Sequence, residues 1–328
     1  MTHLVSVIVP CYNEEKTIGL LLEALDNQSY PLEYIEVVVA DGMSSDRTRA
    51  KINEFLQKGS NLVVRVVDNP RRHIPAGLNI ALKAANGKII VRLDAHSAPQ
   101  PDYIARCVDA LQQGLGENVG GVWEIKPPND GWLAQGIAVA AAHPLGVGDA
   151  HYRHAEQARW VDTVPFGSFF RSLIERIGFY DEQLLANEDY EFNVRIRQAG
   201  GKIWLDPAIR STYFSRANLR ELARQYWRYG YWKARMLRRY PETIRWRQAL
   251  PPAFVVSLLG FLILSMWLPF ARWIIMLELF FYLLVLFSAG LQVAIKRKDW
   301  RYIISVPLAI ATMHLSWGSA FLWSILAG

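Results

Sequence analysis

The chain has 328 residues, of which 52% are hydrophobic and 12% aromatic, and its formal net charge is +6 at pH 7. Its two cysteines, Cys11 and Cys107, lie far apart, which excludes a disulfide framework and favours a reducing compartment. No GxGxxG follows a predicted strand and no GxxxxGK followed by Ser or Thr occurs, which argues against a dinucleotide dehydrogenase and a P-loop NTPase.

The N-terminal part of the chain alternates apolar, β-branched runs with amphipathic segments. Strands are predicted at residues 4–9, 35–40, 62–67 and 88–94. Helices are predicted between them, the first capped by Asn13 and the third over 75–87. Strands that alternate with helices at this spacing predict a parallel α/β sheet, and ligands bind such sheets at the carboxyl ends of the strands. Tyr12, Asn13, Asp41 and Asp94 fall at such ends.

Residues 216–252 form a stretch that is both basic and aromatic. From Arg216 to Pro251 there are ten Lys or Arg and two Glu, whereas the rest of the chain has 26 Lys or Arg against 28 Asp or Glu. Such a stretch can bind nucleic acid, but its place directly before an apolar run favours an amphipathic interfacial segment on anionic lipid headgroups. We therefore expect a lipid bilayer, and no nucleic acid, as its partner.

The C-terminal part carries three apolar runs, at about 253–270, 273–295 and 302–326. Each is close to the roughly 20 residues that cross a bilayer, so three transmembrane helices are predicted. The basic cluster at 296–301 lies between the second and third runs, which the positive-inside rule places on the cytosolic side. The N-terminus lacks a basic n-region and a small-residue cleavage site, so we expect no signal peptide. These features predict a multi-pass protein of the inner (plasma) membrane, with a cytoplasmic N-terminal part and the C-terminus outside.

Four segments of the chain carry a resemblance to a known family. They are VSVIVPCYNEEKTI, VVVADGMSSDRT, GLNIALKAANGKIIVRLDAH and NEDYEFNVRIRQAGGKIWLDP. In this order they resemble the family 2 glycosyltransferases with a GT-A fold, and more narrowly the membrane-attached bacterial exopolysaccharide enzymes of the succinoglycan type. The resemblance implies an α/β catalytic domain at 1–215, with a Rossmann-like, mostly parallel sheet flanked by helices. Interfacial helices at 216–252 and a transmembrane segment at 253–328 would follow it.

The resemblance also implies a site for a nucleotide-sugar donor. The nucleotide-binding positions are Pro10, Tyr12, Glu14, Asp41, Arg71 (or its neighbour Arg72) and Asp94. Asp94-Ala95-His96 stands where the family usually has Asp-x-Asp, so Asp94 and His96 are the expected ligands of a divalent cation on the diphosphate. Mg²⁺ prefers oxygen ligands and imidazole suits Mn²⁺ better, so either cation, Mn²⁺ or Mg²⁺, stays open. Asp41 followed by Gly42 is also typical of an ordinary turn.

The catalytic and acceptor positions follow from the same resemblance. Glu188 and Asp189 match the family's Glu-Asp pair, in which Asp189 is the expected general base and Glu188 a supporting or acceptor-binding group. We expect these roles to split, because two adjacent acids cannot both face one site from a regular element. The acceptor and diphosphate positions are Gly167 and Ser168 in FGSFFR, and Gln225, Trp227 and Arg228 in QYWRY, which resembles Gln-x-x-Arg-Trp with Tyr229 as its last residue. The second motif overlaps the predicted interfacial segment, so an amphipathic anchor is an alternative.

The resemblance implies an inverting, metal-dependent glycosyltransferase of polysaccharide biosynthesis. It would move a sugar from a nucleotide-diphosphate donor, with UDP-sugar expected, to a hydroxyl of a lipid-linked or glycan acceptor at the cytosolic membrane face. One alternative is transfer onto polyprenyl phosphate, an acceptor that is already ionised and needs no general base. The other alternative is a catalytically silent subunit that binds a nucleotide-sugar.

Overall fold

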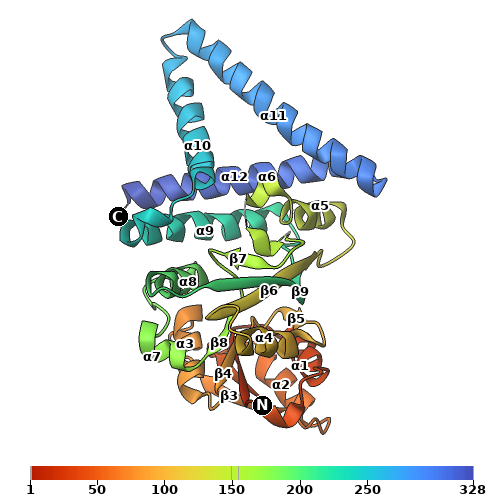
Figure 1. Ribbon diagram of the computed structural model, residues 1–328. Coiled ribbons are helices and arrows are strands. Elements are labelled where there is room, and N and C mark those ends of the chain that lie inside the picture. The colour runs from red at the N-terminus through yellow and green to blue at the C-terminus, as the bar shows by residue number, and fades with distance from the viewer. Residues whose placement is uncertain (1, 149, 154, 328) are drawn as a thin grey trace. The chain divides into compact units, whose positions relative to one another are not determined.

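The computed structural model describes residues 2–148, 150–153 and 155–327 (Figure 1). The chain divides into two compact units. The first comprises Met1–Glu124 and His151–Tyr213, and the second comprises Ile125–Ala150 and Phe214–Gly328. This grouping puts residues 125–150 with the C-terminal helices, whereas the sequence places them in the catalytic domain. The functional boundaries at 215 and 252 stay predictions.

The first unit is built on a nine-stranded sheet. The strands are β1 (Val5–Cys11), β2 (Ile35–Asp41), β3 (Val63–Asp68), β4 (Ile89–Arg92), β5 (Ser97–Pro99), β6 (Asn118–Lys126), β7 (Arg159–Val161), β8 (Ser168–Phe170) and β9 (Ile203–Phe214). Their order in the sheet is β3-β2-β1-β4-β8-β6-β9-β5, and β7 pairs with β9.

The four strands predicted from the sequence are confirmed, and they are parallel. β1 pairs with β2 and β4, and β2 pairs with β3. The register puts Cys11 beside Asp41 and Asp41 beside Asp68. The carboxyl ends of these strands therefore meet at one edge of the sheet, which is where the predicted site residues lie.

The other half of the sheet is antiparallel, so the expectation of a mostly parallel sheet holds only for β1 to β4. β8 pairs antiparallel with β4 and with β6, and β9 pairs antiparallel with β5 and with β7. Three of these strands, β5, β7 and β8, have only three residues each. Strands of three residues are too short to show an alternation in the sequence. Their partners are also distant in the chain, so no local pattern marks the pairing.

Helices cover both faces of the sheet in the first unit. They are α1 (Ile18–Asp26), α2 (Thr48–Leu56), α3 (Ile74–Ala84), α4 (Tyr103–Gln112), α7 (Ser172–Ile177) and α8 (Glu188–Gln198), with short 3₁₀ turns at Leu32–Tyr34 and His151–Arg153. Val7 on β1 packs in one buried cluster with α1, α2 and α4, whereas its neighbour Ile8 packs in the other with α3 and α8. This alternation is the two-residue period of a strand that is buried on both faces.

The first helix begins later than the sequence predicts. α1 starts at Ile18, after Thr17, so Asn13 is not its cap. Asn13 instead adopts a left-handed conformation with φ of 53°, and its side-chain oxygen accepts a hydrogen bond from the Ser45 N–H at 2.8 Å. The segment between β1 and α1 is therefore a loop, and a hydrogen bond joins it to the loop that follows β2.

The second unit is helical. Its elements are α5 (Trp132–Ala140), α6 (Pro144–Val147), α9 (Leu219–Arg239), a 3₁₀ turn at Pro241–Thr243, α10 (Trp246–Leu264), α11 (Pro269–Arg297) and α12 (Tyr302–Leu326). α9 runs alongside α12, while α10 and α11 rise from α12 and meet at a turn (Figure 1). Gly230 of α9 allows close packing, since a Cβ there would lie 2.2 Å from the Trp317 carbonyl oxygen of α12.

Two of the three predicted spans correspond to helices that are long and apolar enough to cross a membrane. These are Pro269–Arg297 and Tyr302–Leu326. The predicted first span differs, because α10 begins at Trp246, its apolar part is only Gln248–Leu264, and it contains Pro251 and Pro252. Much of the α11 surface is apolar and exposed, including Phe270 at 72% and Trp273 at 70%.

Candidate active site

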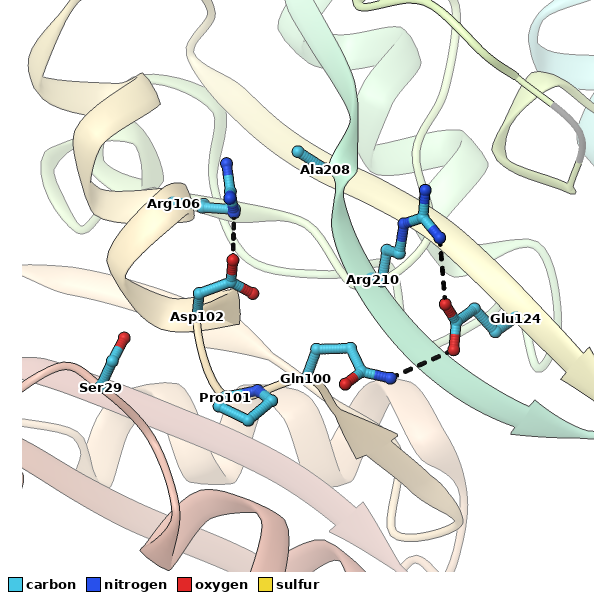
Figure 2. Close-up of a pocket in the computed structure, with 8 residues that line it drawn as sticks. All are labelled: Ser29, Gln100, Pro101, Asp102, Arg106, Glu124, Ala208 and Arg210. Carbon is cyan, nitrogen blue, oxygen red and sulfur yellow. Dashed lines mark hydrogen bonds and ion pairs between the residues drawn. The ribbon is translucent and has the colours of Figure 1, made fainter.

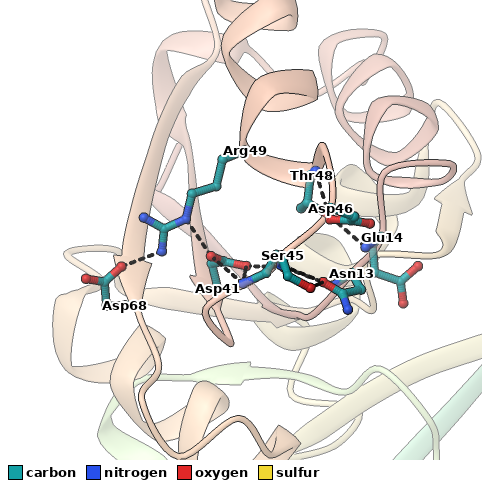
Figure 3. A network of polar contacts seen from close by, with 9 residues as sticks. Asn13, Glu14, Asp41, Ser45, Asp46, Thr48, Arg49 and Asp68 are labelled. Carbon is teal, nitrogen blue, oxygen red and sulfur yellow. Dashed lines mark hydrogen bonds and ion pairs between the residues drawn. The ribbon is translucent and has the colours of Figure 1, made fainter.

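The expected nucleoside pocket lies at the carboxyl ends of β1 and β2. Asp41 is fully buried and accepts hydrogen bonds from the Ser44 hydroxyl and from Arg49 Nε, both at 2.5 Å (Figure 3). The Arg49 guanidinium also bonds Asp68 on β3, and these two carboxylates raise the pKa of Arg49. Tyr12 is 46% exposed, and a Cβ on Gly42 would lie 3.2 Å from it. An exposed ring therefore stands beside a fixed, buried carboxylate.

The loops that follow β1 and β2 are joined by hydrogen bonds (Figure 3). The Asn13 N–H donates to the Ser44 hydroxyl at 2.8 Å, and the Glu14 N–H donates to the Thr48 hydroxyl at 2.8 Å. Asp46 accepts from the Thr48 hydroxyl at 2.5 Å and from its N–H at 3.0 Å. These contacts make the two loops one preformed edge, on which the side chains of Tyr12, Glu14 and Asp41 are held.

Two further predicted nucleotide-binding residues have different surroundings. Pro10 is buried on β1 beside Ala40 of β2. The Arg71 side chain is 66% exposed and forms an ion pair with Glu182. A hydrogen bond from Asn79 and the charge of Arg71 lower the pKa of Glu182 despite its partial burial. Arg71 is thus anchored at the surface of the first unit.

The expected metal corner follows β4. His96 Nδ1 lies 3.0 Å from Glu14 Oε1, and His96 Nε2 lies 3.9 Å from Asp94 Oδ2. The Tyr213 ring meets the His96 ring edge-on at 6.0 Å between centroids. If the carboxylate of Glu14 accepts the Nδ1 proton, Nε2 faces Asp94 with its lone pair, which is the tautomer that binds a metal.

Asp94 and His96 carry donor atoms that suit a divalent cation, but they are not spaced as two ligands of one. Two donors at about 2.1 Å from one octahedral cation lie about 3.0 Å apart in neighbouring positions and about 4.2 Å apart in opposite positions. Asp94 Oδ2 and His96 Nε2 are 3.9 Å apart, so they would have to move about 0.9 Å closer to occupy neighbouring positions. Among the described residues, no group of three or more His, Cys, Asp or Glu could hold a metal ion alone. A cation here would need further ligands from a substrate or from water.

A buried arginine forms ion pairs with three of the predicted acidic residues. Arg92, the last residue of β4, is 3% exposed. Its Nη2 lies 2.8 Å from Asp94 Oδ1 and 3.2 Å from Glu188 Oε1, and its Nη1 bonds Asp189 Oδ2. Burial disfavours the charged guanidinium, but the charges of Asp94 and Glu188 outweigh this and raise the pKa of Arg92. Both adjacent acids contact this one guanidinium, so the argument that they cannot face one site is wrong, while the split of their roles stays a prediction.

The predicted acceptor loop lies directly beside this cluster. The Arg92 N–H donates to the Gly167 carbonyl at 3.0 Å, and Ser168 is fully buried on β8 opposite Val91 of β4. A Cβ on Gly167 would lie 2.2 Å from the side-chain oxygen of Asn118. The close approach that this glycine permits is therefore to Asn118. The contact of Gly167 and Ser168 with an acceptor stays a prediction.

The other predicted acceptor residues belong to the second unit. Gln225 donates to the Tyr229 hydroxyl at 3.0 Å, one turn further along α9. Trp227 and Arg228 are exposed on the same helix. Their exposure suits both the sugar-binding interpretation and the amphipathic anchor.

Sequence reasoning missed Arg92. The residue stands within the apolar run of residues 89–93, which predicts a strand and gives the arginine no role of its own. A signal was present, because an arginine inside a strand buried on both faces must find acidic partners. The nearest acids in the motif, starting with Asp94, would have been the first candidates.

A separate open groove of about 710 Å³ lies in the first unit (Figure 2). It is lined by Ser29, Gln100, Pro101, Asp102, Arg106, Glu124, Ala208 and Arg210. Its arginines are paired within the groove, Arg106 with Asp102 at 2.5 Å and Arg210 with Glu124 at 3.3 Å. None of the predicted site residues lines it, so it is not part of the candidate active site.

Comparison with known proteins identifies the family. Residues 6–179, more than half of the chain, match the model described as "Glycosyl transferase family 2". The chain is 26% identical over 332 residues, 99% of its length and 98% of the relative's, to the dolichyl N-acetyl-alpha-D-glucosaminyl phosphate 3-beta-D-2,3-diacetamido-2,3-dideoxy-beta-D-glucuronosyltransferase of Methanococcus voltae. It is 28% identical over 318 residues to the succinoglycan biosynthesis protein ExoA of Rhizobium meliloti, covering 96% of this chain and 93% of ExoA.

The fold agrees with a solved structure. The mannosyltransferase PcManGT from Pyrobaculum calidifontis, in complex with GDP-Man and Mn²⁺, aligns with a TM-score of 0.66 at 20% identity. The alignment covers all of this chain and 88% of that one. This likeness shows a GT-A-like α/β fold. The family match, the related transferases and the four sequence segments agree, so the chain belongs to glycosyl transferase family 2.

Proposed function

We propose that the chain is an inverting, metal-dependent glycosyltransferase that uses a nucleotide-diphosphate sugar, with UDP-sugar as the expected donor. The observation that carries the proposal is the gathering of Asp94, Glu188 and Asp189 around Arg92. Asp94 follows the parallel strand β4, next to β1, at the edge of the sheet where the loops hold Tyr12 and Asp41. The candidate base Asp189 and the candidate donor-binding residue Asp94 thus contact the same arginine side chain.

The proposed reaction exchanges one bond for another at the anomeric carbon. The acceptor hydroxyl oxygen forms a bond to that carbon while the bond to the diphosphate oxygen breaks, and Asp189 takes the hydroxyl proton. Attack from the face opposite the leaving group inverts the configuration. A divalent cation held by Asp94 and His96 would offset the charge of the departing diphosphate.

The proposed acceptor is a hydroxyl of a lipid-linked or glycan sugar at the cytosolic membrane face. The Methanococcus voltae relative is named for a dolichyl N-acetyl-alpha-D-glucosaminyl phosphate, and the Rhizobium meliloti relative for succinoglycan biosynthesis. The helices α11 and α12, which are long and apolar enough to cross a membrane, support a multi-pass place in the inner membrane. The proposed C-terminus outside needs a third crossing, and α10 is the helix that would supply it. The exposed Trp227 and Arg228 support contact of α9 with anionic headgroups.

A thermal-shift screen tests the donor proposal. The full chain in detergent is heated with UDP, GDP, their sugars and ATP, each with Mg²⁺ and with Mn²⁺. We expect the melting temperature to rise with a nucleoside diphosphate and a cation together, because ligands that bind the folded state stabilise it. Asp41→Asn should lose this rise, while Asp102→Asn in the separate groove should keep it. The absence of any rise with all nucleotides would contradict the proposal.

A further inference from the structure

Arg92 is one positive charge among three carboxylates. Its two terminal nitrogens have different partners: Nη1 donates to Asp189, and Nη2 donates to both Asp94 and Glu188. The guanidinium is almost completely buried, so water screens these charges little. Without the guanidinium the three carboxylates would repel one another and move apart or take up protons.

The rest of the Arg92 side chain is also fixed. The Phe166 ring lies under the guanidinium, with Cζ 5.3 Å from the ring centroid. Phe166 is 1% exposed and has φ of 50°, a left-handed conformation that a bulky residue rarely adopts. The Tyr103 hydroxyl donates to the Phe166 carbonyl at 3.2 Å. Strained residues persist where the surrounding structure holds them, and they cluster at functional sites.

The segment that carries the acids also contains a left-handed residue, here an asparagine, which tolerates this conformation. Asn187, directly before Glu188, has φ of 65°, and α8 begins at the next residue. Both acids therefore stand in the first turn of α8, where the helix dipole favours anions. A left-handed residue on each side of the cluster, Phe166 and Asn187, directs the chain toward Arg92.

We propose that Arg92 is a positioning residue that orients the general base, Asp189, toward the acceptor hydroxyl. This inference rests on the proposed function. Arg92 binds Asp189 through Oδ2, and Asp189 Oδ1 has no hydrogen bond to the described residues. Oδ1 is therefore the oxygen presented to the acceptor hydroxyl, in a direction set by the guanidinium fork. A lysine keeps the charge but has a single nitrogen, so it cannot hold separate acids in two directions.

The test compares Arg92→Lys, Asp189→Asn and the double variant in steady-state turnover of the donor found in the screen. We expect Arg92→Lys to lower kcat on the order of 100-fold, the loss typical of a misplaced catalytic group. The KM for the donor should change far less. The double variant should be no slower than Asp189→Asn alone, because Arg92 acts through Asp189.

Two further variants separate positioning from stability. Arg195 is a matched control on α8, the helix that carries both acids. Its Nε and Nη2 bond Glu191 at 2.6 and 2.9 Å, and its Nη2 donates to the Phe179 carbonyl. Arg195→Lys should lower the unfolding midpoint and keep kcat. Phe166→Leu removes the ring under the guanidinium without changing charge, and should lower kcat while keeping the KM for the donor. It also serves if Arg92→Lys does not fold.

The outcomes are distinguishable. A wild-type chain that turns over no nucleotide-sugar refutes the proposed function and this inference together. An active wild type with unchanged kcat in Arg92→Lys or Phe166→Leu refutes only the inference. Losses that add in the double variant, in proportion to lowered stability, also refute the inference, because they identify Arg92 as a structural counter-ion.

Discussion

Replacing His96 with aspartate should change which metal the site prefers. The substitution restores the Asp-x-Asp pattern and puts an oxygen ligand where His96 Nε2 lies 3.9 Å from Asp94 Oδ2. Mg²⁺ prefers oxygen, whereas an imidazole ligand favours Mn²⁺. We expect His96→Asp to raise the affinity for Mg²⁺ relative to Mn²⁺ by about tenfold, or about 1.4 kcal/mol.

The geometry allows the variant to bind a cation. A shift from 3.9 Å to the right-angle separation of about 3.0 Å moves two side chains by less than 1 Å in total, so the pair can close on a cation without rebuilding the loop. The Glu14 carboxylate, 3.0 Å from His96 Nδ1, loses its partner in the variant and faces a new negative charge. The added negative charge raises the affinity for both cations alike, so the ratio of the two affinities is the quantity to measure.

The assay is a titration of the free Mn²⁺ electron paramagnetic resonance signal in the presence of UDP or GDP, with Mg²⁺ as competitor. His143→Asp is a charge-matched control in the second unit, where the His143 side chain accepts from the Leu145 N–H and aspartate can accept the same bond. The control should leave the Mg²⁺ to Mn²⁺ ratio unchanged. If His96→Asp also leaves it unchanged, His96 is not a ligand and the reasoning is refuted.

Three further predictions concern stability and membrane insertion. Burial raises the pKa of Glu36, but hydrogen bonds from Ser6 and Asn86 and the charge of Arg65 outweigh it and lower that pKa. Stability from Glu36 is therefore complete above the unfolded value of about 4.3 and lost as the pH falls through the lowered folded value, so Glu36→Gln should flatten the acid limb of urea midpoints against pH. Gly121→Ala should destabilise the fold by about 1–3 kcal/mol, because the new Cβ would lie 1.8 Å from the Ile209 carbonyl oxygen. Gly19→Ala in α1 should stabilise the fold by up to about 1 kcal/mol, because no atom lies within 4 Å of the new Cβ. Equal urea midpoints for the two variants would contradict this. Phe280→Arg on the exposed face of α11 should cost about 3 kcal/mol of insertion and raise the fraction extracted by carbonate, and an unchanged fraction would speak against a span there.

The sequence predicted the part of the fold that local patterns encode. The four β-branched runs became β1 to β4. β1, β2 and β4 are buried along their length, which requires nearly continuous apolar residues, whereas β3 lies at the edge of the sheet and is partly exposed. The edge formed by their carboxyl ends brought Asp41 and Asp94 to the same side of the sheet, as expected. The antiparallel half could not be predicted, since strands such as β8 consist of three residues paired with partners far away in the chain.

The site was predicted less completely than the fold. The motifs singled out Asp94, Glu188 and Asp189, but not the arginine that joins them. Adjacent acids on a regular element point in different directions, and that argument does not account for a long guanidinium that reaches both from another strand. Asn13 failed as a helix cap for a similar reason, because its side chain bonds a neighbouring loop instead of the following helix.

The measurement that tests the central claim most directly compares binding and transfer in Asp189→Asn. The variant keeps the size of the side chain and removes the proton acceptor. We predict that it lowers kcat for sugar transfer by about 10²- to 10⁴-fold while the Kd for the nucleotide stays nearly unchanged in isothermal titration. Lost nucleotide binding would contradict the role of Asp189 as the base, and full activity would instead favour polyprenyl phosphate as the acceptor.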